Sequence, residues 1–568
     1  MRVLAAIFLY LAAAARALPN LRALQTGGRQ WRRLSSYTQS ARLQASDAAD
    51  GDGFGHSVAI SGGLIAIGAE QYSTDGGAGA VYIVRASDGV EVARLTAADT
   101  GSYDQFGWSV AMDGDTVVVG AANKVFSTVT DTAPTGGVGD AGAVYVFRTT
   151  DGGSTYVEVA QLTAPAAEQF TGEAFGHAVA ISGDTILVAA PQNRQGRFDP
   201  GAVYVFRTTD GGATYNQVGK LPHPLGASGT GFGTLMAVDG DTLAVGTGFN
   251  SNHPIYGYVV YIFRTTDGGA TYDQVANLTA ADSIPRADYL GYSLAIDGAT
   301  VVVGGSKWIG DHPLTMYTDP DWEGYSEGVV YIFRTTDHGA TYDLVANLTA
   351  TDAIPTSQGS YNSYNTFGSS GLAIDGDTIV VGATEDDSEL GAAYVFRTTD
   401  GGATYGQTAK MTSSEAPSCF YGTVTCTMFH FGRSVAIENG VIAIGAPVNY
   451  AWPYWSIYHK PGSVSVFEKP VPTSQPTPRP TWSFQPTPMP STPKPSPQPV
   501  PQPTPAPSTP QPTPAPSTPQ PSPQPVPQPT PAPSSAAPSG AGAFESDAAT
   551  RAGPLLVLLA AAATAIAL

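Results

Sequence analysis

The chain has 568 residues, a formal net charge of −20 and only 13% charged side chains, with 65 glycines, 46 prolines and two cysteines. This length allows several small domains or one large repetitive domain, and it excludes a miniprotein that depends on disulfides for its core. The acidic balance argues against a nucleic-acid partner, because such proteins neutralise phosphates with lysine and arginine. We therefore predict no nucleic-acid binding, whereas calcium, cationic partners and sugars are compatible with this charge.

Residues 1–17 are predicted to be a secretory signal peptide. Met1-Arg2 precede an apolar run, and Ala15-Arg16-Ala17 form a small-x-small cleavage site. The apolar run is too short for a membrane span. Residues 18–36 then form an N-terminal lead-in, and we expect the protein to enter the secretory pathway.

Residues 37–469 are built from one repeated unit. A phrase of the type F-G-x-S-V-A-I returns seven times, beginning at Phe54, Phe106, Phe175, Phe232, Leu290, Phe367 and Phe431. Each phrase is followed by a tight turn, a second apolar run, a variable segment, a third run such as G-A-V-Y-V-F-R, a turn such as T-T-D-G-G-A-T-Y and a fourth run. The Asp-Gly pairs are typical of hairpins, in which glycine adopts positive φ. Four antiparallel strands per unit predict an all-β fold, a seven-bladed β-propeller.

The seventh unit lacks its fourth strand, which indicates how the ring closes. It ends after residues 462–469, whereas residues 41–55 parallel the end of a complete unit at residues 160–176. We expect the segment around Arg42–Ala45 to supply the missing outer strand of blade seven. This exchange would close the ring and cover its edges.

The repeated phrase, including F-G-R-S-V-A-I-E-N-G-V-I-A-I-G-A-P at residues 431–447, resembles the FG-GAP repeats of the integrin α-subunit β-propeller. Calcium-binding members carry a D-x-D-x-D-G-type loop between the first two strands, but here that place holds short turns such as Asp113-Gly114-Asp115. Two or three residues cannot supply the roughly six to eight oxygens that Ca²⁺ requires. We therefore expect no metal or other cofactor. Asp50 and Asp52, outside that turn, are the weak remaining candidates.

The turn T-T-D-G-G-A-T-Y resembles the Asp-box of sialidase-like propellers, with tyrosine in place of tryptophan. Five copies fit, centred on Asp151, Asp210, Asp267, Asp337 and Asp400. The resemblance implies a hairpin brace away from any active site. One arginine per blade also recurs at an equivalent position, and arginines spread around a ring cannot converge on one carboxylate. We expect these arginines to be structural; they are Arg148, Arg207, Arg264, Arg334 and Arg397.

The rest of the sequence contains few motifs that indicate a chemical function. The histidines show no zinc-binding spacing, and no nucleophile or phosphate-binding motif appears, so we predict no enzyme activity. Cys419 and Cys426 are expected to form a loop disulfide in an oxidising compartment, with two free thiols as the alternative. Asn277 and Asn347 begin N-L-T sequons, which are either glycosylated or a by-product of the repeat.

The variable connections are expected to share one face of the propeller, where loops on a rigid scaffold commonly carry function. Aromatic residues gather in two of them, residues 306–328 and 448–462. The candidate ligand-binding residues are Trp308, Trp322, Trp452, Trp455 and Tyr458. Exposed aromatics suit sugar stacking or a protein hot spot. The alternative is that these rings pack together and plug the channel.

Residues 470–538 hold most of the prolines, mixed with Thr, Ser and Gln. They predict a disordered, extended stalk of polyproline II, with a docking strip for proline-binding modules as the alternative. Residues 539–568 combine small residues, of which Ser539 and Gly540 are candidate attachment sites, with a spacer and an apolar tail. This order is typical of a GPI-attachment signal; a short C-terminal membrane tail or plain secretion is the alternative.

These features together predict an extracellular recognition or adhesion module on the outer cell surface, tethered to the membrane through a lipid anchor. Its ligand would be a glycan or another extracellular protein, bound by the variable loops. A structural cell-coat or wall protein is the alternative, and a propeller glycoside hydrolase is a third reading, for which no convergent acid pair can be placed.

Overall fold

The structure is a computed structural model that describes residues 37–49, 51–70, 77–99, 101–125, 141–166, 174–191, 200–226, 230–248, 259–279, 289–309, 325–351, 366–384, 391–414, 430–447 and 461–469. The chain divides into two compact units, Met1–Arg479 and Pro480–Leu568, and all of the described residues belong to the first. The predicted signal peptide, lead-in, stalk and attachment signal lie outside the described residues.

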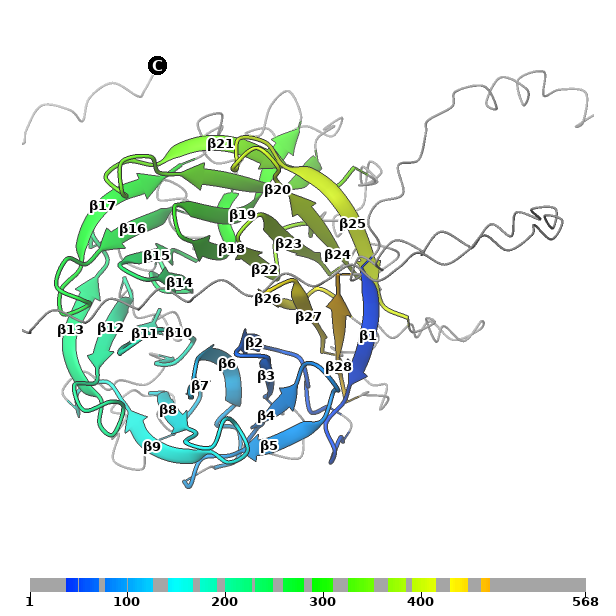
Figure 1. Ribbon diagram of the computed structural model, residues 1–568. Helices are drawn as coiled ribbons and strands as arrows, with labels where there is room; N and C mark the ends of the chain where they lie inside the picture. The colour runs from blue at the N-terminus through cyan, green and yellow to red at the C-terminus, as the bar shows by residue number, and fades with distance from the viewer. Residues whose placement is uncertain are drawn as a thin grey trace, which may run out of the picture. The chain divides into compact units, whose positions relative to one another are not determined.

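The described strands form seven antiparallel sheets of four strands, arranged as the blades of a propeller (Figure 1). Blade one contains β2 (Val58–Ser61), β3 (Leu64–Ala69), β4 (Ala80–Arg85) and β5 (Glu91–Leu95). Blade two contains β6 (Phe106–Asp113), β7 (Thr116–Ala121), β8 (Ala143–Arg148) and β9 (Val157–Leu162). Blade three contains β10 (Ala178–Ser182), β11 (Thr185–Ala190), β12 (Ala202–Arg207) and β13 (Asn216–Pro222). Blade four contains β14 (Leu235–Asp239), β15 (Thr242–Gly246), β16 (Val260–Arg264) and β17 (Asp273–Leu278).

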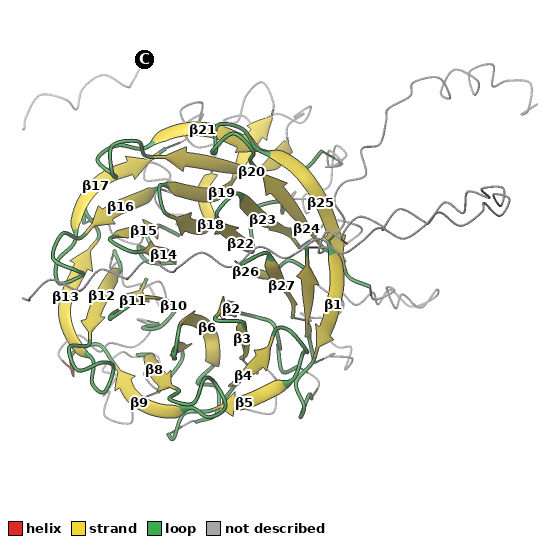
Figure 2. Ribbon diagram, viewed as in Figure 1, coloured by secondary structure: helices red, strands yellow, loops and turns green. Residues whose placement is uncertain are grey.

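Blade five contains β18 (Tyr289–Asp297), β19 (Thr300–Ile309), β20 (Tyr325–Arg334) and β21 (Asp343–Leu348). Blade six contains β22 (Leu372–Asp375), β23 (Thr378–Ala383), β24 (Ala392–Arg397) and β25 (Gly406–Thr412). Blade seven contains β26 (Ser434–Glu438), β27 (Val441–Ala446), β28 (Ser463–Glu468) and the N-terminal strand β1 (Thr38–Leu43). The described part of the chain contains no helix (Figure 2), and the predicted all-β, seven-bladed fold is confirmed.

The hydrophobic core lies between adjacent blades. Every residue of β7 and of β11 is buried, and the third strands are buried almost throughout. These strands are covered on both faces by the neighbouring sheets, which explains why they read as continuous apolar runs rather than as an alternation. The cluster around Val117 and Tyr145 of blade two, for example, also contains Val81 and Ile83 of blade one.

The phenylalanine of each F-G phrase fills the space between two blades. Phe175 is fully buried, and its ring centroid lies 5.3 Å from that of Tyr204. The same cluster includes Val144 of the preceding blade. The next residue, Gly176, has φ +89°, and a Cβ there would lie 2.7 Å from the carbonyl oxygen of Ala143. The phrase therefore pairs a large apolar side chain with a residue that has none, because the two backbones approach closely there.

The ring closes through β1, which appears beside β28 in Figure 1. The two strands pair in antiparallel register from Thr38↔Glu468 to Leu43↔Val464. Between blade seven and blade one, Ser434 Oγ donates a hydrogen bond to the carbonyl oxygen of Gly55 at 2.7 Å. The closure predicted from the missing fourth strand is confirmed.

All seven outermost strands carry a register irregularity next to the third strand. In β1 it falls between Gln39 and Ala41, and in blade four it lies opposite Ile262 and Phe263. A bulge of this kind twists an edge strand and disfavours the addition of a further strand. The rim of the propeller is therefore protected against edge-to-edge association at the same position in every blade.

Candidate functional site

The propeller has two faces of different construction. We call the turn face the one that carries the turns between the first and second strands and between the third and fourth strands of each blade. In blade two these are residues 114–115 and 149–156. The loop face is the opposite one, which carries the connections between the second and third strands and from one blade to the next.

The first turns of the turn face link one blade to another. Asp113 at the end of β6 accepts a hydrogen bond from the backbone N–H of Gly183 in the next blade at 2.7 Å. Glu438 of blade seven accepts hydrogen bonds from the N–H groups of Gly62 and Gly63 in blade one at 3.0 and 3.2 Å. These carboxylates lie at or beside the family's calcium-loop position, where they hold neighbouring turns. Among the described residues, no group of three or more His, Cys, Asp or Glu side chains is placed to hold a metal ion.

The second turns of blades two to six fold around an aspartate. Thr149 Oγ1 donates to Asp151 Oδ1 at 2.8 Å, and the backbone N–H groups of Ser154 and Thr155 donate to the same oxygen at 2.9 Å. Thr155 Oγ1 donates to Asp151 Oδ2 at 2.7 Å. The hydrogen bonds from Thr155 are the main cause that lowers the pKa of Asp151 to about 2. The same pattern of contacts recurs at Asp210, Asp267, Asp337 and Asp400, so these turns are structural braces.

The Asp151 turn makes a pH-dependent contribution to stability. Its folded-state pKa lies below the ordinary value of 3.8, so the stabilisation is complete above pH 4 and is lost as the pH falls towards 2. We expect Asp151→Ala to lower the melting temperature at pH 7 and the difference from wild type to shrink between pH 4 and pH 2. Melting curves across this range test it. Asp151→Asn, which does not titrate, is the control, and a wild-type-minus-alanine difference that is constant with pH would contradict the assignment.

The recurring arginines hold these turns from the preceding blade. Arg334 at the end of β20 donates from Nη1 to the carbonyl oxygen of Gly401 in the turn of blade six. A Cβ on Gly402 would lie 2.8 Å from Cζ of the same arginine, and one on Gly339 would lie 2.7 Å from Arg264 Cδ. The structural role predicted for the arginines is confirmed at these two seams, because they lie against glycines of the next blade and do not converge.

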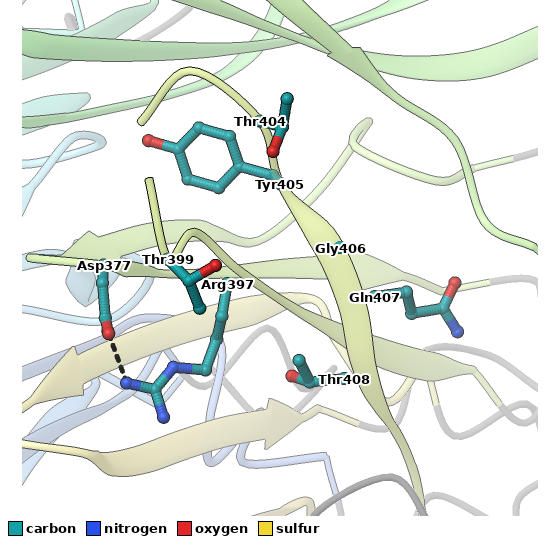
Figure 3. Close-up of a pocket in the computed structure, with 8 residues that line it drawn as sticks. All are labelled: Asp377, Arg397, Thr399, Thr404, Tyr405, Gly406, Gln407 and Thr408. Carbon is teal, nitrogen blue, oxygen red and sulfur yellow. Dashed lines mark hydrogen bonds and ion pairs between the residues drawn. The ribbon is translucent and has the colours of Figure 1, made fainter. Parts of the chain in front are cut away.

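A pocket of about 620 Å³ opens on the turn face at blade six (Figure 3). It is lined by Asp377, Arg397, Thr399, Thr404, Tyr405, Gly406, Gln407 and Thr408. Arg397 forms an ion pair with Asp377, and their side chains are 22% and 48% exposed. All eight of these residues belong to blade six, so we call this cavity the blade-six pocket.

The loop face carries a row of rings at the start of the innermost strands of blades one to three. The ring of Trp108 lies between His56 and His177, with centroid distances of 4.8 and 5.6 Å. His56 Nδ1 lies 2.8 Å from Glu70 Oε1, and both side chains are 9% exposed. Glu70 Oε2 has no hydrogen-bond partner among the described residues. We call these three rings the mouth row; it presents the partly exposed rings of Trp108 and His177 beside a buried pair of His56 and Glu70.

The base of one variable loop, residues 123–140, is held by a buried ion pair. Lys124 Nζ lies 2.9 Å from Asp104 Oδ2, and their side chains are 6% and 4% exposed. Asp104 also accepts a hydrogen bond from the N–H of Gly101 at 2.6 Å. Breaking such a pair is costly because the remaining charge stays buried. The loop thus starts from a fixed point on the loop face.

Blade five extends beyond the other blades on the loop face. β19 has ten residues where β7, β11 and β23 have six. Its additional residues pair with the start of β20, from Ser306↔Gly328 to Ile309↔Tyr325. Four residues add about 13 Å of paired strand. The predicted loop 306–328 is therefore shorter than the sequence suggested, because both of its ends are strands; we call this extension the blade-five ribbon.

The model of the FG-GAP repeat matches residues 37–84, 90–147, 156–206 and 342–396. Each match begins on or just before an outermost strand and runs to the third strand of the next blade, so the sequence repeat is offset from the blade by one strand. The propeller carries FG-GAP repeats. This fold suggests a ligand-binding or adhesion-type module.

No curated protein matches the chain. Among solved structures, the FG-GAP propeller is similar to the crystal structure of Saccharomyces cerevisiae Sqt1, with 11% sequence identity and a TM-score of 0.38. The match covers 77% of this chain and 100% of that chain.

Only one of the five predicted ligand-binding residues lies in the described part of the FG-GAP propeller. Trp308 lies on β19, in the blade-five ribbon. The other four candidates are outside the described residues; they are Trp322, Trp452, Trp455 and Tyr458. The predicted disulfide cysteines, Cys419 and Cys426, and the attachment candidates, Ser539 and Gly540, are outside them as well. No helix long and apolar enough to cross a membrane occurs in the part of the chain that the structure describes.

The other predicted sites fall on described strands and loops. Asn277 and Asn347 are exposed on β17 and β21, at equivalent positions of two outermost strands, and their glycosylation stays a prediction. Asp50 is outside the described residues. Asp52 is buried and accepts a hydrogen bond from the N–H of Ala49 at 2.6 Å, which occupies one of its oxygens within its own loop.

Sequence reasoning missed the mouth row of the FG-GAP propeller. A signal for it exists, because the residue after F-G is His56, Trp108 and His177 in three consecutive repeats. Within a single repeat, each of these residues is only one variable position after the F-G pair. Only the ring arrangement of the blades brings the three positions side by side.

Proposed function

We propose that this protein is an extracellular recognition or adhesion module that binds a glycan or another extracellular protein through the loop face of its FG-GAP propeller. The proposal includes a location on the outer cell surface, a lipid anchor and no catalytic activity. The observation that carries it is the unequal construction of the two faces. Five copies of one short turn occupy the turn face, whereas the loop face has connections of unlike length and the blade-five ribbon.

The positions of the chain ends support this choice of face. β28 runs towards the turn face and ends there at Glu468, and β1 begins opposite it at Thr38. The described propeller is therefore entered and left on the turn face. The loop face therefore carries neither end of the described propeller.

The mouth row supports a polar ligand with an apolar surface, such as a sugar. Trp108 and the two histidines form a run of rings, and the Glu70 carboxylate holds the His56 ring at 2.8 Å. Aromatic rings with a polar neighbour suit ligands that have one apolar and one polar side. The row lies on the loop face, at the start of the innermost strands of blades one to three.

A glycan array combined with a panel of chromogenic glycosides tests the proposal. We expect retention of one class of glycan without turnover of any glycoside, and a parallel screen with extracellular proteins covers the second ligand class. Turnover would establish a glycoside hydrolase instead. No binding and no turnover in any of these assays would favour a structural cell-coat or wall protein.

The predicted aromatic residues of the last variable loop provide the sharpest variants. We expect Trp452→Ala and Trp455→Ala each to weaken ligand binding by about 1–3 kcal/mol without a change in melting temperature. Val157→Ala, on an outermost strand and 65% exposed, is the control and should change neither quantity. If the two tryptophans plug the channel, their removal should instead cost about 3–5 kcal/mol of stability, and the loop face would lose its aromatic contact.

A further inference from the structure

One position on the outermost strands differs in its chemistry from blade to blade. It lies opposite the tyrosine of the third strand in blades one to six, as Lys220 lies opposite Tyr204, and opposite Ser465 in blade seven. We call it the rim position. In blades one to seven it holds Arg94, Gln161, Lys220, Asn277, Asn347, Lys410 and Arg42.

Where the rim position holds a cation, the side chain lies over its own blade. Lys220 Nζ is 4.9 Å from the ring centroid of Tyr204, and Lys410 Nζ is 5.2 Å from that of Tyr394. The bulge two residues earlier disturbs the backbone edge of the strand, but the side chains around it still face outwards. A lysine or arginine among them disfavours association with another chain, because two such surfaces repel each other.

Blade two has no cation at the rim position, but its residue is engaged in another way. Gln161 Nε2 donates hydrogen bonds to Asp99 Oδ2 and to the hydroxyl oxygen of Tyr145, each at 3.1 Å. The glutamine is therefore part of a polar network that anchors the outermost strand to the connection before the next blade.

Blades four and five have neither a cation nor such a network. Their outermost strands, β17 and β21, lie on the circumference of the ring (Figure 1), and the only charge on each is the aspartate at its first residue. The bulge residues Val275 and Val345 are 36% and 38% exposed. Val218 of blade three is 45% exposed, but Lys220 follows two residues later. Blades four and five thus have the exposed valine without the neighbouring cation.

In these two blades the rim position begins a sequon, at residues 277–279 and 347–349. The asparagine and the threonine are exposed in both, and the leucine between them is buried. The leucine and threonine belong to the repeat, because residues 95–96 and 162–163 are the same pair. The asparagine alone therefore creates the acceptor for an N-linked glycan, and it does so in the two blades that have an unguarded valine.

We propose that Asn277 and Asn347 carry N-linked glycans, which take the place of the rim cation and keep the outermost strands of blades four and five from associating with a second copy of the chain. The proposal rests on the extracellular location of the proposed function, because this modification takes place in the secretory pathway. A hydrated oligosaccharide beside Val275 and Val345 excludes a second chain by its bulk, as Lys220 does beside Val218 by its charge.

The chemistry requires an available amide nitrogen on each asparagine. Nδ2 forms a bond with the anomeric carbon of an oligosaccharide, the bond from that carbon to a pyrophosphate oxygen of the lipid donor breaks, and Nδ2 loses one proton. Gln274 Nε2 donates a hydrogen bond to Asn277 Oδ1. This contact uses the amide oxygen and leaves Nδ2 for the glycosidic bond, so the described structure accommodates the modified residue.

The test uses the full chain, expressed in eukaryotic cells and purified in one detergent throughout. Wild type should lose mass when a peptide N-glycosidase is added, and Asn277→Gln and Asn347→Gln should each remove one glycan. The double glutamine variant should have no glycan and should sediment as larger species than wild type. The double lysine variant, Asn277→Lys with Asn347→Lys, is the matched control. It also has no glycan, but it has the cation of blade three and should not associate.

Three results would overturn the proposal: bare asparagines on secreted wild type, a double glutamine variant that associates no more than wild type, or a double lysine variant that associates as the double glutamine variant does. If the double glutamine variant is not secreted, the single variants decide, because each loses one guard and should shift towards larger species. A wild-type chain that never enters the secretory pathway would contradict the proposed location and this proposal together, whereas bare asparagines on secreted protein contradict this proposal alone.

Discussion

Deletion of residues 37–46 is expected to open the propeller and to lower its stability more than any single substitution. The deletion removes β1 and with it the whole register from Thr38↔Glu468 to Leu43↔Val464. It also exposes one side of β28, in which Val464 and Val466 are fully buried. Truncation of a buried leucine such as Leu43 alone costs about 2–5 kcal/mol, and the deletion adds the lost strand pairing to that cost.

Thermal and denaturant unfolding of the deletion variant, Leu43→Ala and Thr38→Ala measure this effect. Thr38 is exposed at the end of β1, so its replacement should stay within about 0.5 kcal/mol of wild type. The freed edge of β28 should also make the deletion variant associate, because an unpaired strand edge is a template for another chain. A deletion variant that melts as wild type and remains monomeric would disprove closure by β1.

Replacement of Phe175 by alanine is expected to cost about 3–5 kcal/mol. Its side chain is fully buried and contacts the rings of Tyr204 and Phe206, with centroid distances of 5.3 and 6.1 Å. The cavity would lie between two blades, where neither sheet can move inwards without breaking its contacts with the next one. Phe175→Ala should therefore destabilise the junction of blades two and three.

The chain itself offers the matched control for this variant. Blade five has Leu290 at the equivalent position, and that leucine is 5% exposed. We expect Phe175→Leu to cost less than about 1.5 kcal/mol, as other swaps that nearly conserve volume do. Denaturant midpoints of the two variants test the prediction. Equal losses for leucine and alanine would mean that the ring contacts, rather than the filled volume, provide the stabilisation.

The fold was predictable because the same pattern of strands and turns is repeated seven times in the sequence. Seven copies of the repeated phrase, the turns between them and the absent fourth strand of the last unit indicated the number of blades and the closure by the segment around Arg42–Ala45. Each of these signals is local, because strand, turn and buried residue are set by short-range periodicity and by glycine at positive φ. When the same four-stranded unit is repeated and each unit must cover the apolar face of its neighbour, the units form a closed ring.

The candidate sites could be predicted only in part. The loop-face hypothesis followed from differences in loop length, and the blade-five ribbon agrees with it, although Ser306–Ile309 pair as a strand where the sequence suggested a loop. The mouth row could not be found in the same way. Its rings come from three repeats, and their separation in space depends on the radius of the ring, which no single repeat encodes.

The sequence by itself thus determined the blades, their number and the strand that closes them, because these depend on the local pattern of each repeat. The tertiary structure alone decided what happens between the blades: that Asp113 holds the turn of the next blade, and that Arg334 covers the glycines of blade six. These contacts join residues from different repeats. Their partners are fixed by the packing of one sheet against the next, and the sequence pattern within a repeat carries no information about that packing.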